Sequence, residues 1–154
     1  MPTDTHDSSG PAADPAVDPA GVLGPDFPVP PLHERMGIVV TSATAQGAEG
    51  TLPVDGNTQP YGLLHGGASA VLAEGLGSIA AHLHAATLGK LAVGVDLNVT
   101  HHRGVRTGLV HGVATAIHLG GSVVSYEIVL TDDDGRRICT GRLTCMLIQP
   151  RAPE

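Results

Sequence analysis

The sequence is poor in aromatic and basic residues. Aromatic residues make up 2% of the 154 residues and tryptophan is missing, while 8 Lys and Arg stand against 15 Asp and Glu. A protein that reads nucleic-acid bases needs aromatic faces for stacking, and one that wraps a polyanion needs an excess of positive charge. The composition therefore argues against a nucleic-acid partner, although a few arginines in one place could still hold a small anionic ligand.

Long apolar runs are also missing. The best candidate, from Gly66 to Leu83, is interrupted by Glu74 and His82 and falls short of the roughly 20 apolar residues that span a bilayer. The N-terminal stretch has neither the basic start nor the apolar centre of a signal peptide. We therefore expect a cytoplasmic protein without a membrane partner.

Cysteine is scarce, with only Cys139 and Cys145. Six residues apart on one strand, they would share a face but sit about 20 Å from each other, which is too far for a disulfide. We expect two buried, reduced thiols.

Residues 1–31 differ in composition from the rest of the chain. They contain five Asp and eight of the twelve Pro but no Lys or Arg. Such a stretch buries too little apolar surface to offset its ordering entropy. We predict a disordered or loosely attached tail over residues 1–31 and one folded domain over residues 32–150.

One long helix and several strands are predicted in that domain. From about His65 to Ala86 the residues are small and aliphatic on nearly all helical faces, so this helix belongs inside the protein. The C-terminal half alternates at short period, with the turn Asp133-Asp134-Gly135 between its last two strands. The arrangement predicts an α+β fold in which an antiparallel sheet, ending in a four-stranded meander, wraps around one central helix. The expected strands are Met36–Val40, Glu49–Val54, Leu91–Val99, Gly108–Leu119, Val123–Thr131 and Arg137–Ile148.

Glu74 is the sole carboxylate in the predicted helix. A buried carboxylate is costly unless it has partners, and Ser78 lies one helical turn further on, on the same face. A catalytic carboxylate fits this pattern. A glutamate at a subunit seam or at a solvent-facing edge of the helix fits it equally well.

The start of the helix carries Gly66 and Gly67 after His65. The first turn of a helix leaves N–H groups unpaired at the positive end of the dipole, and these groups can polarise a carbonyl. Gln59 could add a second donor or be an ordinary loop amide. His65 could act on a ligand or simply cap the helix.

Together these residues resemble a known family. The string Gln59-Pro60-Tyr61-Gly62-Leu63-Leu64-His65-Gly66-Gly67, followed by Leu72-Ala73-Glu74 and Ser78, resembles the signature of the PaaI-like hotdog-fold acyl-CoA thioesterases. It is most similar to the branch that acts on 1,4-dihydroxy-2-naphthoyl-CoA and other aromatic acyl-CoAs, including the enterobactin proofreading enzymes. The similarity runs from about Leu32 to Ile148.

The resemblance implies a role for each of these residues. Glu74 would be the nucleophile or general base, and Ser78 would position it or the attacking water. Gly66, assisted by Gln59, would offer an N–H to the thioester oxygen, and His65 would orient the thioester. The family places this site between two subunits, which implies a homo-oligomer and, by analogy, a dimer of dimers.

The resemblance also implies residues that bind coenzyme A, which is part of the substrate, so no cofactor is expected. Arg103 and Arg106 form a local basic spot suited to phosphates. Relatives often carry basic or polar residues at the positions of Ser122 and Val123, so this chain departs from the family there. The implied contacts are Gly94, His101, His102, Arg103, Gly104, His118, Leu119, Gly120, Gly121, Ser122 and Val123.

Metal and serine-hydrolase chemistry find little support. Neighbours on a strand point to opposite faces, so His101 and His102 are poorly placed to share one ion, and His82 and His84 are two apart on a helix. No Gly-x-Ser-x-Gly elbow occurs. Two alternatives to a thioesterase stay open: a hotdog dehydratase or hydratase, and a non-catalytic acyl-CoA-binding module.

Overall fold

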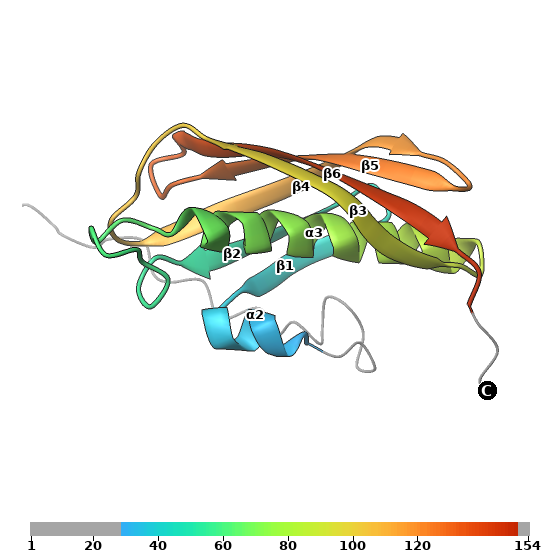
Figure 1. The fold of residues 1–154 in the computed structure, drawn as a ribbon, viewed down its shortest axis with the longest axis horizontal. Coiled ribbons are helices and arrows are strands. Elements are labelled where there is room, and N and C mark those ends of the chain that lie inside the picture. Colours follow the sequence, from blue (N-terminus) through green and yellow to red (C-terminus); the bar gives the residue numbers. More distant parts are fainter. Residues whose placement is uncertain (1–28, 151–154) are drawn as a thin grey trace, which may run out of the picture.

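The computed structural model describes residues 29–150. The tail predicted for residues 1–31 lies almost wholly outside them, and its boundary stays a prediction. Helices and strands within the described range follow one another as shown in Figure 1. They are α2 (Pro31–Met36), β1 (Val39–Thr44), β2 (Gly47–Pro53), α3 (Gly66–Thr87), β3 (Leu91–His101), β4 (Leu109–Leu119), β5 (Val123–Thr131) and β6 (Arg137–Ile148).

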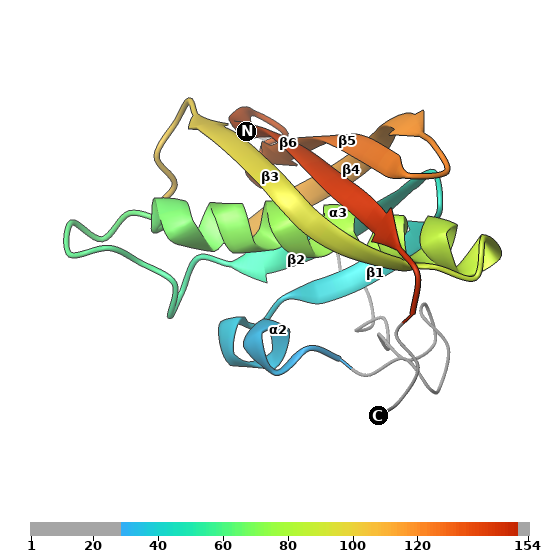
Figure 2. The same cartoon turned by 45° about the vertical axis from the view of Figure 1, so that its right-hand side comes forward.

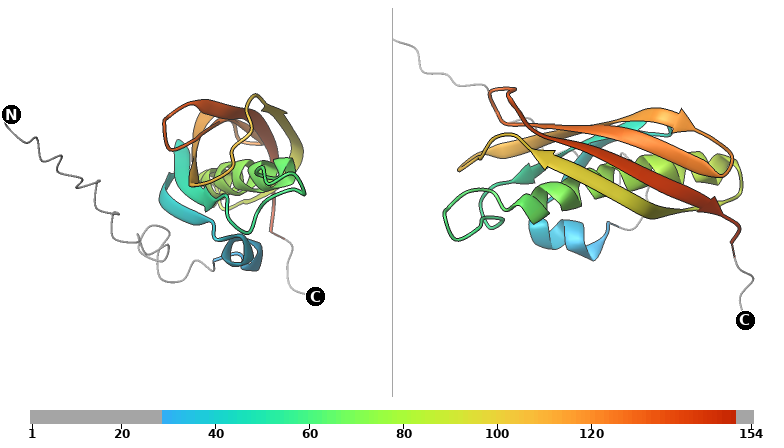
Figure 3. Two further views of the ribbon diagram at one scale, coloured as in Figure 1. Left: turned by 90° about the vertical axis from the view of Figure 1, so that its left-hand side faces the viewer. Right: turned by 45° about the horizontal axis from the view of Figure 1, so that its top comes forward.

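The six strands form one antiparallel sheet in the order β1-β2-β4-β5-β6-β3. Viewed along α3, the sheet curls around the helix (Figure 3, left), and the same wrapping is visible from the side in Figure 2. The predicted sheet around one central helix is therefore confirmed. The predicted four-stranded meander is wrong, because β3 pairs with β6 at the edge and β4 pairs with β2. The connection between β3 and β4, residues 102–108, is too long for a tight hairpin and passes the start of α3.

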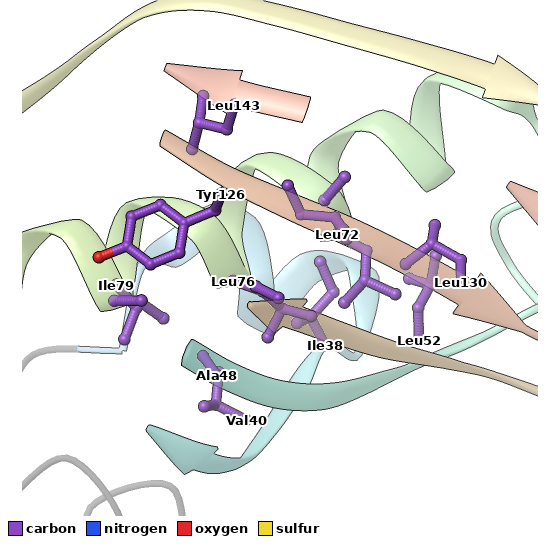
Figure 4. Packing of buried hydrophobic residues seen from close by; sticks show 14 of the residues in the cluster. Ile38, Val40, Ala48, Leu52, Leu72, Leu76, Ile79, Tyr126, Leu130 and Leu143 are labelled. Carbon is purple, nitrogen blue, oxygen red and sulfur yellow. The ribbon is translucent and has the colours of Figure 1, made fainter. Parts of the chain in front are cut away.

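The core lies between α3 and the concave face of the sheet. Leu72 and Leu76 of α3 are fully buried, and Tyr126 of β5 packs beside them while its hydroxyl donates to the Ala45 carbonyl at 2.9 Å (Figure 4). Burial of each leucine side chain contributes about 1.5–3 kcal/mol. Ten of the 22 residues of α3 are buried, on several faces, which confirms a helix that belongs inside the protein.

The N-terminal part of the domain differs from the prediction. Met36–Val40 was expected to form a strand, but Met36 ends α2 and β1 begins at Val39. Gly37 adopts a left-handed conformation with φ 70°; its N–H donates to the Glu34 carbonyl and the N–H of Ile38 donates to the His33 carbonyl, which ends the helix. The short helix α2 itself was not predicted. It lies beneath α3 on the side that the sheet leaves open (Figure 1).

Strand β3 forms one edge of the sheet. Its backbone pairs only with β6 among the described strands, and three of its apolar side chains, Leu91, Val93 and Val95, are 42–54% exposed. Long apolar edge strands are templates for pairing with another chain.

Cys139 and Cys145 both lie buried and unlinked on β6, as predicted. No helix among residues 29–150 is long and apolar enough to cross a membrane.

Candidate active site

Glu74 lies half-buried in the middle of α3, where its carboxylate has a defined position. The Ser78 hydroxyl donates to Oε1 of Glu74 at 2.9 Å, as the one-turn spacing predicted. On the other side lies the backbone of Gly94 in β3, where an added Cβ would come within 2.8 Å of the same oxygen. The carboxylate therefore occupies space that exists because residue 94 has no side chain.

The Cys145 thiol lies close to this carboxylate, because Cys145 pairs with Gly94 across β3 and β6. Burial, and then the negative charge of Glu74, raise the pKa of Cys145 to about 11, while the Ser78 hydroxyl partly opposes the shift. The thiolate is the nucleophilic form of cysteine, and it is suppressed near neutral pH. Of these two groups, the carboxylate is the one available for chemistry.

Glu74 and Ser78 open onto a cavity of about 540 Å³ between α2, α3 and β3, hereafter the Glu74 cavity. Its size is typical of small-molecule sites. Apart from these two side chains and two histidines, its lining is apolar or glycine. The lining residues are Pro30, Leu32, His33, Ala70, Val71, Glu74, Gly75, Ser78, Ile79, His82 and Leu97.

His33 of α2 is a site residue that the sequence did not reveal. Its side chain is 6% exposed and lies against Gly75, where an added Cβ would approach Nε2 to 2.5 Å. Burial lowers the pKa of His33 below its usual 6.5. A lone histidine in a six-residue helix has no periodic pattern to mark it. Gly75 in the interior of a helix was the only signal that something approaches there.

The start of α3 is organised by two histidines. The Gly67 N–H donates to Nδ1 of His65 at 2.8 Å, so His65 caps the helix. Because Nδ1 accepts this bond, the proton of the neutral ring is on Nε2. His101 donates from Nε2 to the Gly66 carbonyl at 3.1 Å and thereby ties the end of β3 to the first turn of α3.

A second cavity of about 370 Å³, hereafter the helix-start cavity, brings together several predicted residues. Gln59 and Gly66, predicted to bind the thioester oxygen, line it together with predicted coenzyme A contacts. His102, which follows the end of β3, bonds the Thr140 hydroxyl at 2.9 Å, and both its ring and that of His101 line this cavity. The coenzyme A contacts in this cavity are His101, His102, Arg103 and Gly104.

The remaining predicted residues lie elsewhere in the chain. The loop of residues 118–123 packs at the C-terminal end of α3, where His84 donates to the Gly120 carbonyl at 3.0 Å. At 1.5 Å per residue the C-terminal end of α3 is roughly 30 Å along the helix from Gly66. Gly94 lies beside Glu74 and lines neither cavity. Glu74 and Gly66 are themselves about 12 Å apart along the helix and belong to different cavities.

Among residues 29–150, no group of three or more His, Cys, Asp or Glu side chains is placed to hold a metal ion.

The chain is similar to known thioesterases. A model of the thioesterase superfamily matches residues 61–139. The proofreading thioesterase EntH of Cronobacter sakazakii is 47% identical over 116 residues, covering 75% of this chain and 84% of that protein. For EntH of Klebsiella pneumoniae the identity is 51% over 110 residues, or 71% and 80% of the two chains.

Two solved structures agree with these matches. A thioesterase from Haemophilus influenzae is 38% identical with a TM-score of 0.71, covering 77% of this chain and 82% of that one. A glutamine-to-alanine variant of a thioesterase from Pseudomonas aeruginosa is 42% identical with a TM-score of 0.72, covering 76% and 85%. These similarities confirm the hotdog fold predicted from the sequence.

Proposed function

The chain belongs to the thioesterase superfamily and is a thioester hydrolase, and from this premise we propose that it hydrolyses aromatic acyl-CoA thioesters with Glu74 as the reacting carboxylate. The observation that carries the proposal is the position of Glu74. It is the sole carboxylate of α3, its Oε1 accepts a hydrogen bond from the Ser78 hydroxyl, and it opens onto a largely apolar cavity. A carboxylate at the edge of an apolar pocket is suited to attack an acyl group held there.

The reaction consumes water and releases a carboxylic acid and the thiol of coenzyme A. In one route Glu74 takes a proton from water while the hydroxide attacks the carbonyl carbon, and the proton is later passed to the departing sulfur. In the other route Glu74 attacks directly, expels the thiolate and forms a mixed anhydride, which water then cleaves. In both routes the Gly66 N–H and the Gln59 amide stabilise the oxyanion that forms on the carbonyl oxygen.

We propose that a second copy of the chain completes the site. Glu74 and Gly66 are about 12 Å apart in one subunit, too far to act on one carbonyl. The exposed apolar edge of β3, with Leu91, Val93 and Val95, is suited to pairing with the same edge of a partner. Such pairing would bring Glu74 of one subunit towards Gly66 of the other. Val113 and Ile117, exposed on β4, support a further association of two dimers.

The acyl group fits the Glu74 cavity and coenzyme A fits the helix-start cavity. A volume of about 540 Å³ with aliphatic walls accommodates one or two aromatic rings. Arg103 lines the helix-start cavity and, together with Arg106, lines a neighbouring cavity, so two cations are available to phosphates.

Replacement of the carboxylate by its amide tests the central claim. Glu74→Gln keeps the size of the side chain but removes the base and the nucleophile, so kcat for benzoyl-CoA should fall by about 10²–10⁴-fold. Glu127→Gln, an exposed position on β5, is the matched control and should keep full activity. Normal hydrolysis by Glu74→Gln would refute the assignment. A single turnover in ¹⁸O-water separates the two routes, because only the anhydride route leaves the label in Glu74.

The substrate class is tested by comparing kcat/KM over aroyl-, arylacetyl- and medium-chain acyl-CoAs. The proposal expects the aroyl thioesters to lead. A preference for aliphatic chains would overturn the substrate class while leaving the role of Glu74 intact.

A further inference from the structure

The Glu74 cavity contains a polar group that the proposed hydrolysis does not use, the imidazole of His33. The side chain is 94% buried, yet neither ring nitrogen has a hydrogen-bond partner among residues 29–150. Within that part of the chain no side-chain nitrogen or oxygen is both fully enclosed and unpaired. The unpaired nitrogens of His33 are therefore accessible from the cavity that this side chain lines. Water satisfies these nitrogens in the ligand-free protein, and a ligand that displaces the water leaves them unpaired unless it offers a polar group of its own.

The cavity wall is shaped to receive this ring. An alanine at position 75 would place its methyl carbon 2.5 Å from Nε2 and 2.7 Å from Cε1 of His33, so only glycine lets the ring lie against α3. Gly75 follows Glu74 directly, which sets the imidazole on the same stretch of helix as the reacting carboxylate. An acyl group whose carbonyl lies at Glu74 therefore has its ring within reach of His33.

Resting on the proposed function, we propose that His33 is a specificity-determining residue, which hydrogen-bonds a hydroxyl substituent on the aromatic ring of the acyl group. A neutral imidazole has one donor and one acceptor nitrogen, and a phenolic hydroxyl can serve either. The surrounding side chains, Leu32, Val71, Ile79 and Leu97, are apolar and hold the ring carbons. Hydroxylated aroyl thioesters satisfy the imidazole, whereas unsubstituted benzoyl-CoA leaves it unpaired.

The consequence is a selectivity that resides in His33. A pocket built to hydrogen-bond a substrate hydroxyl discriminates against the analogue without it, because the buried polar group is then left unpaired. Replacement of His33 by leucine removes the unpaired group, so the preference disappears while hydrolysis continues.

The test compares benzoyl-CoA with 2-, 3- and 4-hydroxybenzoyl-CoA, by kcat/KM, in three variants and the wild type. In His33→Leu the ratio of kcat/KM for the preferred hydroxy isomer to that for benzoyl-CoA should fall at least about ten-fold. His33→Asn keeps a donor and an acceptor and should retain part of the preference. Gly75→Ala keeps the imidazole but displaces it, and should reproduce the loss of preference seen in His33→Leu.

Several outcomes would overturn the inference. A wild type that prefers no hydroxy isomer, or an unchanged preference in His33→Leu, contradicts it. An equal fall on both classes of substrate identifies His33 as a packing residue only. If His33→Leu does not fold, Gly75→Ala and His33→Asn decide the matter by the same ratio. These failures leave the proposed function standing, whereas a wild type that hydrolyses no aroyl-CoA overturns both.

Discussion

The two cavities along α3 differ in chemistry although the same helix lines both. The Glu74 cavity is bounded mainly by aliphatic side chains and contains a single carboxylate. The helix-start cavity contains an amide, two imidazoles, an arginine and the first turn of the helix, and it contains no carboxylate. One is suited to an apolar acyl group and the other to a polar, anionic carrier. Under the proposed function, the helix separates the reacting carboxylate from the groups that polarise the carbonyl and bind the carrier.

This separation has a structural consequence for the reaction. A thioester carbonyl has to meet the carboxylate and the oxyanion donors together, yet one chain holds them about 12 Å apart. The exposed β3 edge offers the way to bring them together, since the two halves of one site can come from two subunits. In the proposed dimer, the two cavities are the contributions of two chains to one site.

The largest expected effect comes from disabling the two halves of the proposed site in separate variants and then mixing the variants. Glu74→Gln damages one half, and Gln59→Ala, which removes the amide donor, damages the other. Each protein should lose about 10²-fold or more in kcat. In a mixed dimer one of the two sites receives intact residues from both chains. Because about half of randomly formed dimers are mixed, about a quarter of wild-type activity should return. The activity is measured after subunit exchange under mild denaturant.

Sites formed within one chain would give no recovery in this experiment. Mixing either variant with itself is the control, and the fraction of mixed dimers is read from native mass spectrometry of differently tagged chains.

A smaller effect separates binding of the carrier from binding of the acyl group. Arg103→Gln removes a cation from the helix-start cavity and should raise KM for benzoyl-CoA about ten-fold with kcat little changed. The benzoyl thioester of N-acetylcysteamine lacks the phosphates, so its KM should not respond. Arg142→Gln, an exposed arginine on β6, is the matched control. An equal rise in KM for both thioesters would place Arg103 near the thioester instead of the phosphates.

The smallest effect concerns stability and follows from the buried imidazole of the Glu74 cavity. Burial lowers the pKa of His33 in the folded protein, so below about pH 6.5 the unfolded chain binds a proton that the folded chain does not. The free energy of unfolding should therefore fall as pH drops from 6.5 towards the folded pKa, and this contribution should be constant above 6.5. Urea unfolding at pH 7.5 and 5.5 measures it.

His33→Gln serves as the reference for that measurement, because the other titratable groups of the cavity, Glu74 and His82, are present in both proteins. The wild type should lose more stability than His33→Gln on acidification. Equal losses would mean that the imidazole titrates as it does in water.

Much of the fold follows from local patterns in the sequence. The predicted helix from about His65 to Ala86 matches α3 within one residue at each end, because an uninterrupted run of small and aliphatic residues leaves little choice of period. The C-terminal strands were similarly well marked by alternation and by the turn at Gly135. The order of the strands in the sheet could not be predicted, because the position of β3 beside β6 depends on a long connection that local periodicity does not describe.

The site was predicted only where it depends on spacing along one element. Ser78 and Glu74 share a helical face, so their hydrogen bond follows from spacing alone. Gly94 reaches Glu74, and His33 reaches the neighbouring Gly75, from other elements, and only tertiary packing brings them there. For His65 the sequence left open a cap or a ligand group; the structure shows the cap, and the role towards the thioester stays a prediction.

Gly75 gives this protein a conflict between robustness and selectivity. Glycine in the interior of a helix costs about 1 kcal/mol relative to alanine, so the chain keeps a weak point at the centre of its longest helix. The imidazole of His33 occupies the volume that a methyl group would need. Selection for heat resistance would favour alanine only if the imidazole moved aside at a cost below that gain, and the proposed substrate preference would then be lost. Selection on discrimination between substrates would retain the glycine.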